Sequence, residues 1–176
     1  MQNDEEIQLR GFILDVPDYP REGIVFKDIT PLLKDRKAFR ECIDQLVKTV
    51  SGMSFEYVLG VEARGFILGG AVAYRLGKGF IPARKRGKLP RRVLTQEYAL
   101  EYGAAALDMH ADAVEGGGRV LIIDDLLATG GTALAAARLI EGAGGIVAGA
   151  AFVIELGSLN GRKKLDSYKV LSLLRY

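Results

Sequence analysis

The sequence predicts an α/β fold in which a Rossmann-like parallel sheet is flanked by helices. Two segments carry this prediction, because each has a short apolar run, then a turn, and then a helical pattern. In the first, residues 55–61 are predicted to form a strand and residues 65–76 a helix rich in small residues. In the second, the β-branched run 120–123 precedes a helical pattern over 133–140. Continuous apolar runs of this kind are typical of strands buried in a parallel sheet.

The remaining elements extend this pattern along a chain that we expect to form one domain over residues 1–176. Residues 4–14 are expected to form a short helix, and residues 24–31 an edge strand that follows a turn with two prolines. Asp35 is expected to cap a helix that runs to about Val50. Further strands are expected over 80–83, 95–103, 146–156 and 169–173, and a short helix over 159–165.

Bulk composition excludes several classes of protein. A hydrophobic content of 49% with 26% charged residues is ordinary for a globular protein, and a net charge of +2 is too small to argue for nucleic-acid or membrane binding. Cys42 is the single cysteine, so no internal disulfide is possible, and we expect it to be a small core residue. No apolar run approaches the ~20 residues of a membrane span, and the acidic start has no apolar signal segment. We therefore expect a cytoplasmic protein.

The segment 119–132 is the centre of the functional interpretation. Its strand is followed by two carboxylates, Asp124 and Asp125, which are expected to end the strand. A turn rich in glycine and hydroxyl groups then leads into the helix, so unpaired backbone N–H groups and the helix dipole favour an anion there. The acids can accept hydrogen bonds from two vicinal hydroxyls or hold a cation. Together these features suit a ribose 5-phosphate, with the phosphate on Ala128, Thr129, Gly130, Gly131 and Thr132.

Simpler interpretations of the same residues remain open. Two glycines before a helix are often only a turn, and two acids after a strand are often solvated. The dinucleotide pattern G-x-G-x-x-G and the triphosphate pattern G-x-x-x-x-G-K-[ST] are both absent. His110 is the only histidine and has no second histidine or cysteine for a metal site, so we interpret it as a surface or core residue.

Two further segments could bind a charged ligand. Residues 60–65 form a second turn between a strand and a helix, at the kind of sheet edge where α/β proteins bind ligands. Residues 84–92 are the only dense run of positive charge. That run is either a solvated face, a nucleic-acid patch or a mobile loop that closes over a highly charged pyrophosphate. No aromatic side chains interleave it to stack bases, which argues against the second option.

These motifs resemble those of the type I phosphoribosyltransferases. The run Val-Leu-Ile-Ile-Asp-Asp-Leu-Leu-Ala-Thr-Gly-Gly-Thr at 120–132 is similar to the family's phosphoribosyl-pyrophosphate motif, and its wording from Asp124 onward resembles the adenine-specific branch. The segments 19–31, 84–90 and 98–103 also resemble that branch, and the likeness extends over 16–174. The family often has proline where this chain has Glu22 and Arg86, and both departures lie in turns.

The resemblance implies a reaction and a set of roles. It implies transfer of a phosphoribosyl group from phosphoribosyl pyrophosphate to adenine, giving AMP and pyrophosphate, in a homodimer whose Mg²⁺ is held mainly through the donor rather than by protein ligands. It also implies an N-terminal hood over residues 1–34, a flexible basic loop and a cis peptide between Glu62 and Ala63. The implied roles are acid–base catalysis by Glu101; ribose binding by Asp124 and Asp125; phosphate binding by 128–132; pyrophosphate binding by Arg64, Arg84, Lys85, Lys88 and Tyr102; and base binding by Val25, Phe26, Lys27 and Leu126.

Two other functions are compatible with the same motifs. One is a purine phosphoribosyltransferase specific for xanthine or hypoxanthine, against which the hood and the Leu-Glu-Tyr-Gly segment at 100–103 argue. The other is a regulator that only senses the ribosyl donor. Such a regulator would need a DNA-binding domain or a basic RNA-binding face, whereas here the basic residues cluster in one short loop.

Overall fold

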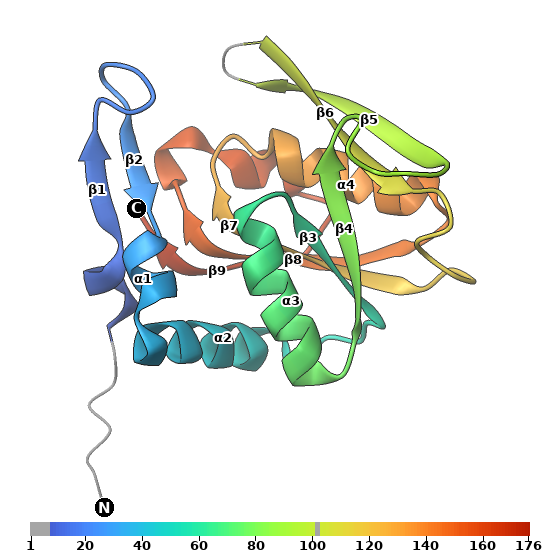
Figure 1. The fold of residues 1–176 in the computed structure, drawn as a ribbon, viewed down its shortest axis with the longest axis horizontal. Coiled ribbons are helices and arrows are strands. Elements are labelled where there is room, and N and C mark those ends of the chain that lie inside the picture. The colour runs from blue at the N-terminus through green and yellow to red at the C-terminus, as the bar shows by residue number, and fades with distance from the viewer. Residues whose placement is uncertain (1–7, 101–102) are drawn as a thin grey trace, which may run out of the picture. The chain divides into compact units, whose positions relative to one another are not determined.

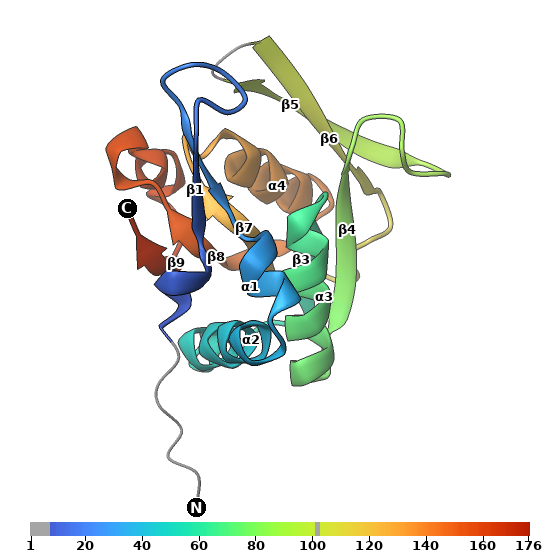
Figure 2. The ribbon, with the colours of Figure 1, turned by 60° about the vertical axis from the view of Figure 1, so that its left-hand side comes forward.

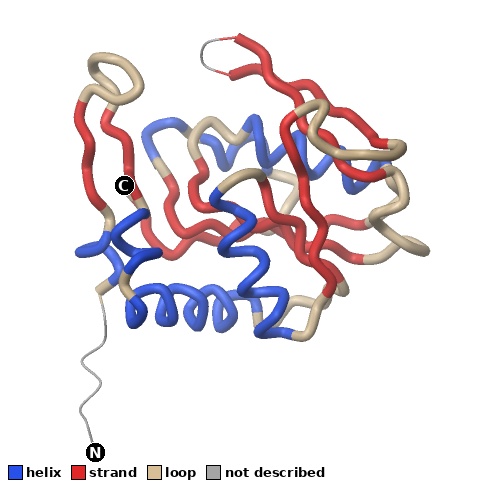
Figure 3. The backbone as a smooth tube through the Cα atoms, in the orientation of Figure 1, coloured by secondary structure: helices blue, strands red, loops and turns tan. Residues whose placement is uncertain are grey.

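The computed structural model describes residues 8–100 and 103–176. The chain divides into two compact units, one that ends at Gln45 and a larger one that begins at Leu46. Figures 1 and 3 show the path of the chain through both units. The predicted hood over residues 1–34 falls inside the first unit, and its role over a base stays a prediction.

The N-terminal unit contains a two-stranded antiparallel ribbon, in which residues 14–17 pair with residues 25–28. Of the helix expected over 4–14, residues 4–7 lie outside the described residues, and the described part contains a single 3-10 turn at 9–12. The helix prediction is wrong at Leu14, which already belongs to the ribbon. The elements are η1 (Leu9–Phe12), β1 (Leu14–Pro17), β2 (Val25–Asp28) and α1 (Thr30–Lys34).

Helix α2 (Arg36–Val50) begins and ends where the sequence predicts. The Asp35 carboxylate accepts hydrogen bonds from the backbone N–H groups of Lys37 and Ala38, each at 2.9 Å, which confirms the predicted cap. Cys42 lies on this helix and is fully buried. Burial raises the pKa of its thiol to about 12, so the thiol stays protonated at neutral pH, as expected of a core residue.

The larger unit is built on a seven-stranded sheet among the described residues, in the order β5-β6-β4-β3-β7-β8-β9. The strands from β4 to β9 in that order are parallel, whereas β5 and β6 form an antiparallel hairpin at one edge. This confirms the predicted mostly parallel α/β fold. The strands are β3 (Tyr57–Val61), β4 (Gly79–Lys85), β5 (Val93–Leu100), β6 (Gly103–His110), β7 (Arg119–Leu127), β8 (Ile146–Glu155) and β9 (Val170–Arg175).

Two helices cover opposite faces of this sheet. After β3 the chain moves through α3 (Arg64–Leu76) to β4, and after β7 it moves through α4 (Gly131–Gly142) in the opposite direction to β8. Right-handed crossovers in opposite directions place their helices on opposite faces, and Figure 2 allows both helices to be followed. The packing agrees, because Gly69 of α3 approaches Val58 of β3, whereas Leu59 belongs to the core cluster on the α4 side.

This arrangement makes the gap between β3 and β7 a topological switch point. In open α/β sheets, ligands bind at such a point, outside the carboxyl ends of the strands. Both turns that the sequence analysis singled out, 60–65 after β3 and 128–132 after β7, lie at these ends. The fold therefore brings together two segments that are more than 60 residues apart in the sequence.

Several boundaries differ from the sequence predictions. The edge strand expected over 24–31 ends at Asp28, because α1 begins at Thr30. Strand β7 does not end at its acids but continues through Leu127, because residues 126–127 still pair with β8. Strand β4 includes Arg84 and Lys85, which pair with β6 and so begin the basic segment as strand rather than loop. The helix expected over 159–165 is instead two 3-10 turns, η2 (Gly157–Leu159) and η3 (Gly161–Leu165). In the described part of the chain, no helix is both long and apolar enough to cross a membrane.

Candidate active site

A cleft of about 490 Å³ opens at the carboxyl ends of β3 and β7. Its walls are formed by residues 61–64 at the end of β3 and by residues 124–133, which run from the end of β7 into the start of α4. The β5–β6 hairpin contributes Tyr98 and Leu107, and the remaining walls come from Lys85, Phe152 and Leu159. The cleft therefore lies at the switch point that the topology defines, and most of its lining comes from the segments 61–64 and 124–133.

The turn after β7 requires glycine at position 130. Gly130 precedes α4 and has φ +79°, a left-handed conformation that side chains disfavour. A Cβ at Gly130 would also lie 2.4 Å from the carbonyl oxygen of Gly161. Because α4 begins at the next residue, the first backbone N–H groups of this helix have no partner within the helix and face the end of the cleft that the turn forms.

The two acids of β7 have different surroundings. The Asp125 side chain is only 6% exposed and accepts a short hydrogen bond from Nε of Arg64, at the start of α3. The Asp124 carboxylate accepts the backbone N–H of Asp125 at 2.9 Å. Burial, together with the negative charge of Asp125, raises the pKa of Asp124 well above its usual range. The charged form of Asp124 is therefore disfavoured in the folded protein.

A small residue at the start of α3 allows the helix to approach these acids. A Cβ at Gly65 would lie 2.8 Å from Oδ1 of Asp124 and 2.9 Å from the carbonyl oxygen of Ile123. Any larger residue would push the turn after β3 away from β7. Gly65 therefore sets the distance between the two walls of the cleft.

Glu62 gathers the basic residues of the following segment. Its carboxylate accepts hydrogen bonds from Nζ of Lys88 at 2.9 Å, from the backbone N–H of Lys85 at 3.0 Å and from the Arg84 guanidinium at 3.3 Å. The peptide bond between Glu62 and Ala63 is cis, as the resemblance implied. Glu62 thus ties the turn after β3 to the basic segment at residues 84–88.

The other side of the basic segment is anchored by a buried acid on β6. Asp108 is 2% exposed and accepts the backbone N–H of Gly87 and the hydroxyl of Thr95, both at 2.7 Å. The Arg84 guanidinium also donates to the carbonyl oxygen of Lys88 at 3.0 Å. These bonds hold the turn at 86–88 above the end of β4.

We predict that Glu62 makes the protein less stable in acid. Lys88, then Arg84 and the Lys85 N–H, lower the pKa of Glu62 from 4.5 to about 2. Since the folded state holds the charged form more tightly than the unfolded state, this contribution is present above pH 4.5 and is lost as the pH falls towards 2. Melting temperatures of the wild type and Glu62→Gln should therefore differ at pH 7 and converge near pH 2. A constant difference across that range would contradict the assignment.

The structure brings together only part of the predicted residue set. Residues 128–132, both acids, Arg64, Lys85 and Leu126 line the cleft. Arg84 and Lys88 are described but contact Glu62 and do not line it. Glu101 and Tyr102 fall outside the described residues. No role in this set is tested by the geometry alone.

The predicted base-binding residues of the hood lie in the N-terminal unit. Lys27 donates to the Asp15 carboxylate at 2.7 Å across the β1–β2 ribbon. The Phe26 ring meets Tyr19 edge to face, with 5.3 Å between the ring centroids. Val25 is 48% exposed, which is unusual for an apolar strand residue. Binding of a base by these three residues stays a prediction.

Sequence reasoning missed three contributors to the site. The carboxylate of Glu62 was not singled out, because its partners lie 22 to 26 residues further along the chain. The contributions of Phe152 and Gly161 depend on how β8 and η3 return to β7. Only the short Leu-Asn-Gly-Arg run at 159–162, a turn signal inside an expected helix, could have drawn attention to Gly161.

Comparison with known proteins agrees with this geometry. The model of the phosphoribosyl transferase domain matches residues 28–174. The adenine phosphoribosyltransferase of Thermotoga neapolitana is 55% identical over 97% of this chain and all of its own length.

Solved structures of the same enzyme are also similar. The adenine phosphoribosyltransferase of Thermoanaerobacter pseudethanolicus is 53% identical, covers 96% of this chain and 98% of its own, and superposes with a TM-score of 0.94. The enzyme of Saccharomyces cerevisiae, solved with an imino-altritol bisphosphate and adenine, is 37% identical over 94% of this chain and 96% of its own, with a TM-score of 0.88. This chain therefore belongs to the phosphoribosyltransferase family, among the adenine phosphoribosyltransferases.

Proposed function

We propose that this protein transfers the 5-phosphoribosyl group of phosphoribosyl pyrophosphate to adenine, giving AMP and pyrophosphate. The observation that carries the proposal is the end of β7, where two acids are followed four residues later by a glycine turn at the start of α4, inside a cleft at the switch point of the sheet. Family membership supplies the substrates, and the cleft supplies a place for the sugar and its phosphate.

We assign the 5-phosphate of the donor to the turn at 128–132. Its backbone N–H groups and the N-terminus of α4 favour a dianion. The hydroxyl groups of Thr129 and Thr132 add donors at the same place, and both residues line the cleft. Anchoring the phosphate fixes the ribose relative to the base, a positioning effect worth several kcal/mol when the geometry is good.

We assign the 2′ and 3′ hydroxyls of the ribose to Asp124 and Asp125. These acids precede the phosphate-binding turn in the sequence and line the same cleft. Arg64 holds the Asp125 carboxylate in place through its short hydrogen bond. The acids also place negative charge near C1, which gains positive character as its bond to pyrophosphate breaks.

The leaving pyrophosphate is assigned to Arg64, Arg84, Lys85 and Lys88, and to Tyr102. Lys85 lines the cleft, and Arg84 and Lys88 form ion pairs with Glu62. In the protein without substrate, Glu62 thus takes the place of a polyanion as the partner of these cations. Pyrophosphate carries more charge than one carboxylate, so it can draw Arg84 and Lys88 from Glu62 when the donor binds.

Mg²⁺ is the cofactor that this chemistry needs. The described residues contain no group of three or more His, Cys, Asp or Glu side chains that could hold a metal ion. The cleft lining contains three carboxylates, of which Glu62 is paired with Arg84 and Lys88 and Asp125 with Arg64, which fits an ion that arrives with the oxygen-rich donor. When bound, Mg²⁺ would neutralise the pyrophosphate as it leaves.

We assign the base to Leu126 in the cleft and, from the sequence resemblance, to Val25, Phe26 and Lys27. Nitrogen N9 of adenine attacks C1 of the ribose as the bond from C1 to the pyrophosphate oxygen breaks. The N9 proton passes to Glu101, and pyrophosphate leaves with the bonding electron pair. Closure of the basic segment would exclude water, which would otherwise hydrolyse the ribosyl cation. We further propose a homodimer and a cytoplasmic location.

An assay with labelled adenine tests this function. Formation of AMP should depend on both phosphoribosyl pyrophosphate and Mg²⁺. Excess unlabelled guanine, hypoxanthine or xanthine should leave the rate nearly unchanged. Inhibition by an oxopurine, with formation of its own nucleotide, would favour the oxopurine specificity instead. Binding of the donor without any turnover would favour a regulator.

We predict that Asp124→Asn raises the thermal stability of the protein and weakens its binding of the ribosyl donor. The raised pKa of Asp124 means that the charged form is disfavoured in the folded protein, so this group lowers stability as the pH rises through its folded pKa. The amide removes that penalty, and the melting temperature should rise by about 2–4 °C at pH 8 for a chain of this size, with no gain below pH 4. The KM for the ribosyl donor should rise in the same variant. A lower melting temperature at pH 8 would contradict this reasoning.

A further inference from the structure

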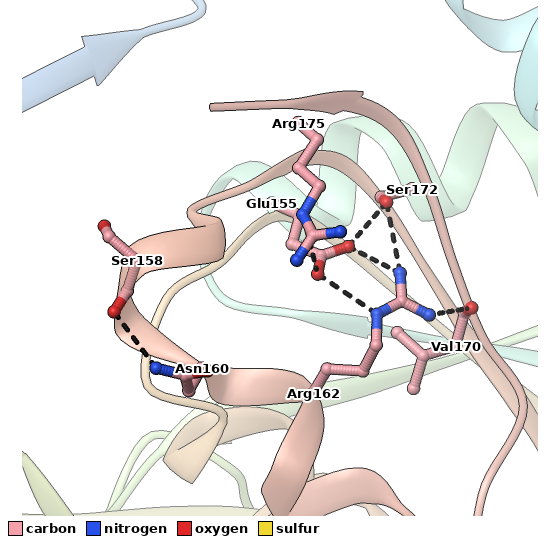
Figure 4. Close-up of polar contacts among 7 residues, drawn as sticks. All are labelled: Glu155, Ser158, Asn160, Arg162, Val170, Ser172 and Arg175. Carbon is pink, nitrogen blue, oxygen red and sulfur yellow. Dashed lines mark hydrogen bonds and ion pairs between the residues drawn. The ribbon is translucent and has the colours of Figure 1, made fainter.

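A cluster of polar side chains lies at the ends of β8 and β9, and its members do not line the main cleft. Figure 4 shows its centre, where Arg162 of η3 meets Glu155 of β8 and Ser172 of β9. The carboxylate of Glu155 is buried, with 4% of its side chain exposed. None of these residues has a role in the proposed reaction.

The Arg162 guanidinium is held on three sides. Its Nε and Nη2 donate to the two Glu155 carboxylate oxygens at 3.0 and 2.5 Å. Its Nη1 donates to the carbonyl oxygen of Val170 at 2.6 Å, and Nη2 also reaches the Ser172 hydroxyl at 3.3 Å. The Ser172 hydroxyl in turn donates to Glu155 at 2.7 Å. The planar fork of arginine is thus fixed to two strands at once, which a lysine could not reproduce.

The residue before Arg162 lies directly behind the phosphate-binding turn. A Cβ at Gly161 would lie 2.1 Å from the carbonyl oxygen of Ala128 and 2.8 Å from the nitrogen of Gly130. The contact is mutual, since a Cβ at Gly130 would meet the Gly161 carbonyl oxygen at 2.4 Å. Gly161 is buried, and it follows Asn160, which has φ +53° and lets the chain reverse between η2 and η3. Backbone here packs on backbone with no side chain between.

We propose that Arg162 is a positioning residue for the phosphate-binding turn, acting through the Gly161 backbone that its clamp on Glu155 and Ser172 holds against Ala128 and Gly130. This inference rests on the proposed function, because it needs the turn at 128–132 to bind the 5-phosphate. The N–H groups of such a turn must all point at one anion, so a small shift of its backbone weakens several hydrogen bonds together. Arg162 and Gly161 are adjacent in the chain, so holding the Arg162 side chain in place also restrains the Gly161 backbone.

A purely structural salt bridge would behave differently. Removing Arg162, whose side chain is 45% exposed, leaves the buried Glu155 carboxylate with Ser172 and the more distant Arg175 guanidinium, 3.8 Å away, as partners, and this lowers stability. It would not by itself change the ratio between the affinities for a phosphorylated and an unphosphorylated ligand. That ratio therefore separates a positioning role from a structural one.

The test measures binding of AMP and of adenosine to the wild type and to Arg162→Ala by calorimetry. We expect the Kd of AMP to rise about 10-fold or more, as for the loss of one or two charged hydrogen bonds, and that of adenosine to change less than about 2-fold. In steady-state assays the KM for phosphoribosyl pyrophosphate should rise while the KM for adenine stays the same. Arg162→Lys should recover only part of the loss. Lys163→Ala, an exposed neighbour on the same 3-10 turn, should match the wild type.

A second variant keeps the inference testable if Arg162→Ala does not fold. Gly161→Ala leaves the clamp intact but forces the turn at 128–130 to move, so it should produce the same selective loss of AMP binding. Gly70→Ala provides the matched control, because a Cβ at Gly70 has no neighbour within 4 Å.

Two results would overturn the inference in distinguishable ways. If the wild type binds AMP no more tightly than adenosine, the proposed function fails, and the positioning role fails with it. If the wild type prefers AMP and the Arg162→Ala and Gly161→Ala variants keep the same ratio of affinities, only the positioning role fails.

Discussion

Glu101→Gln is expected to lower kcat by roughly 10²–10⁴-fold, the usual contribution of a positioned acid–base group. The affinity for AMP should change by less than about 3-fold, because the amide keeps the size and hydrogen-bonding capacity of the side chain. The residue follows β5 directly, and Tyr98 of the same strand lines the cleft. Tyr98 precedes Glu101 by three residues in the sequence. Pre-steady-state measurement of AMP formation, alongside AMP titration, separates the two quantities.

The control for this variant is Glu97→Gln, which makes the same chemical change four residues earlier in the sequence, on β5. Glu97 is exposed and pairs with Arg86 at 3.2 Å. Such surface pairs are typically worth less than about 1 kcal/mol, so kcat should be nearly unchanged. Equal losses of kcat and AMP affinity in Glu101→Gln would mean that Glu101 binds the nucleotide and does not accept the N9 proton of adenine.

Much of this fold could be predicted because its signals are local. The apolar run before Asp124, the glycines after it and the helical pattern that follows lie within one short segment, so the strand, the turn and α4 were found in place. The same holds for the cap at Asp35. The resemblance to a family then joined motifs that physical patterning alone could not have joined. The comparisons confirm that family.

What could not be predicted depends on tertiary contacts. Strand β7 continues past its acids because β8 offers partners to Leu126 and Leu127, and nothing in the local sequence announces those partners. Glu62 holds cations that follow it by more than 20 residues, and its acidity is visible only once β4 lies beside β3. Residues 159–165 form 3-10 turns in place of the expected helix, and the close approach of Gly161 to Ala128 is a tertiary contact that the local sequence does not contain.

Asp125→Asn is expected to raise the KM for phosphoribosyl pyrophosphate by roughly 10–100-fold, the equivalent of one hydrogen bond to a charged group. The Asp125 carboxylate lines the cleft, and the hydrogen bond from Arg64 fixes its orientation. Asparagine keeps the shape but offers one acceptor oxygen where the carboxylate offers two. The KM for adenine should stay within about 3-fold of the wild type, since the base is assigned to other residues. Initial rates over a grid of both substrates measure the two constants together.

A double variant of Arg64 and Asp125 separates two roles of Arg64, orienting Asp125 and contacting the pyrophosphate. If Arg64 acts by orienting Asp125, then Arg64→Gln should cost little in a protein that already carries Asp125→Asn, because residues in direct contact are not additive. If Arg64 also contacts the pyrophosphate, as we propose, the double variant should lose about as much again in donor affinity. Asp112→Asn, at an exposed pair with Arg91, controls for the loss of a surface carboxylate. An unchanged donor KM in Asp125→Asn would remove the acidic pair from the ribose site and leave the glycine turn as the only assigned anchor of the donor in this wall of the cleft.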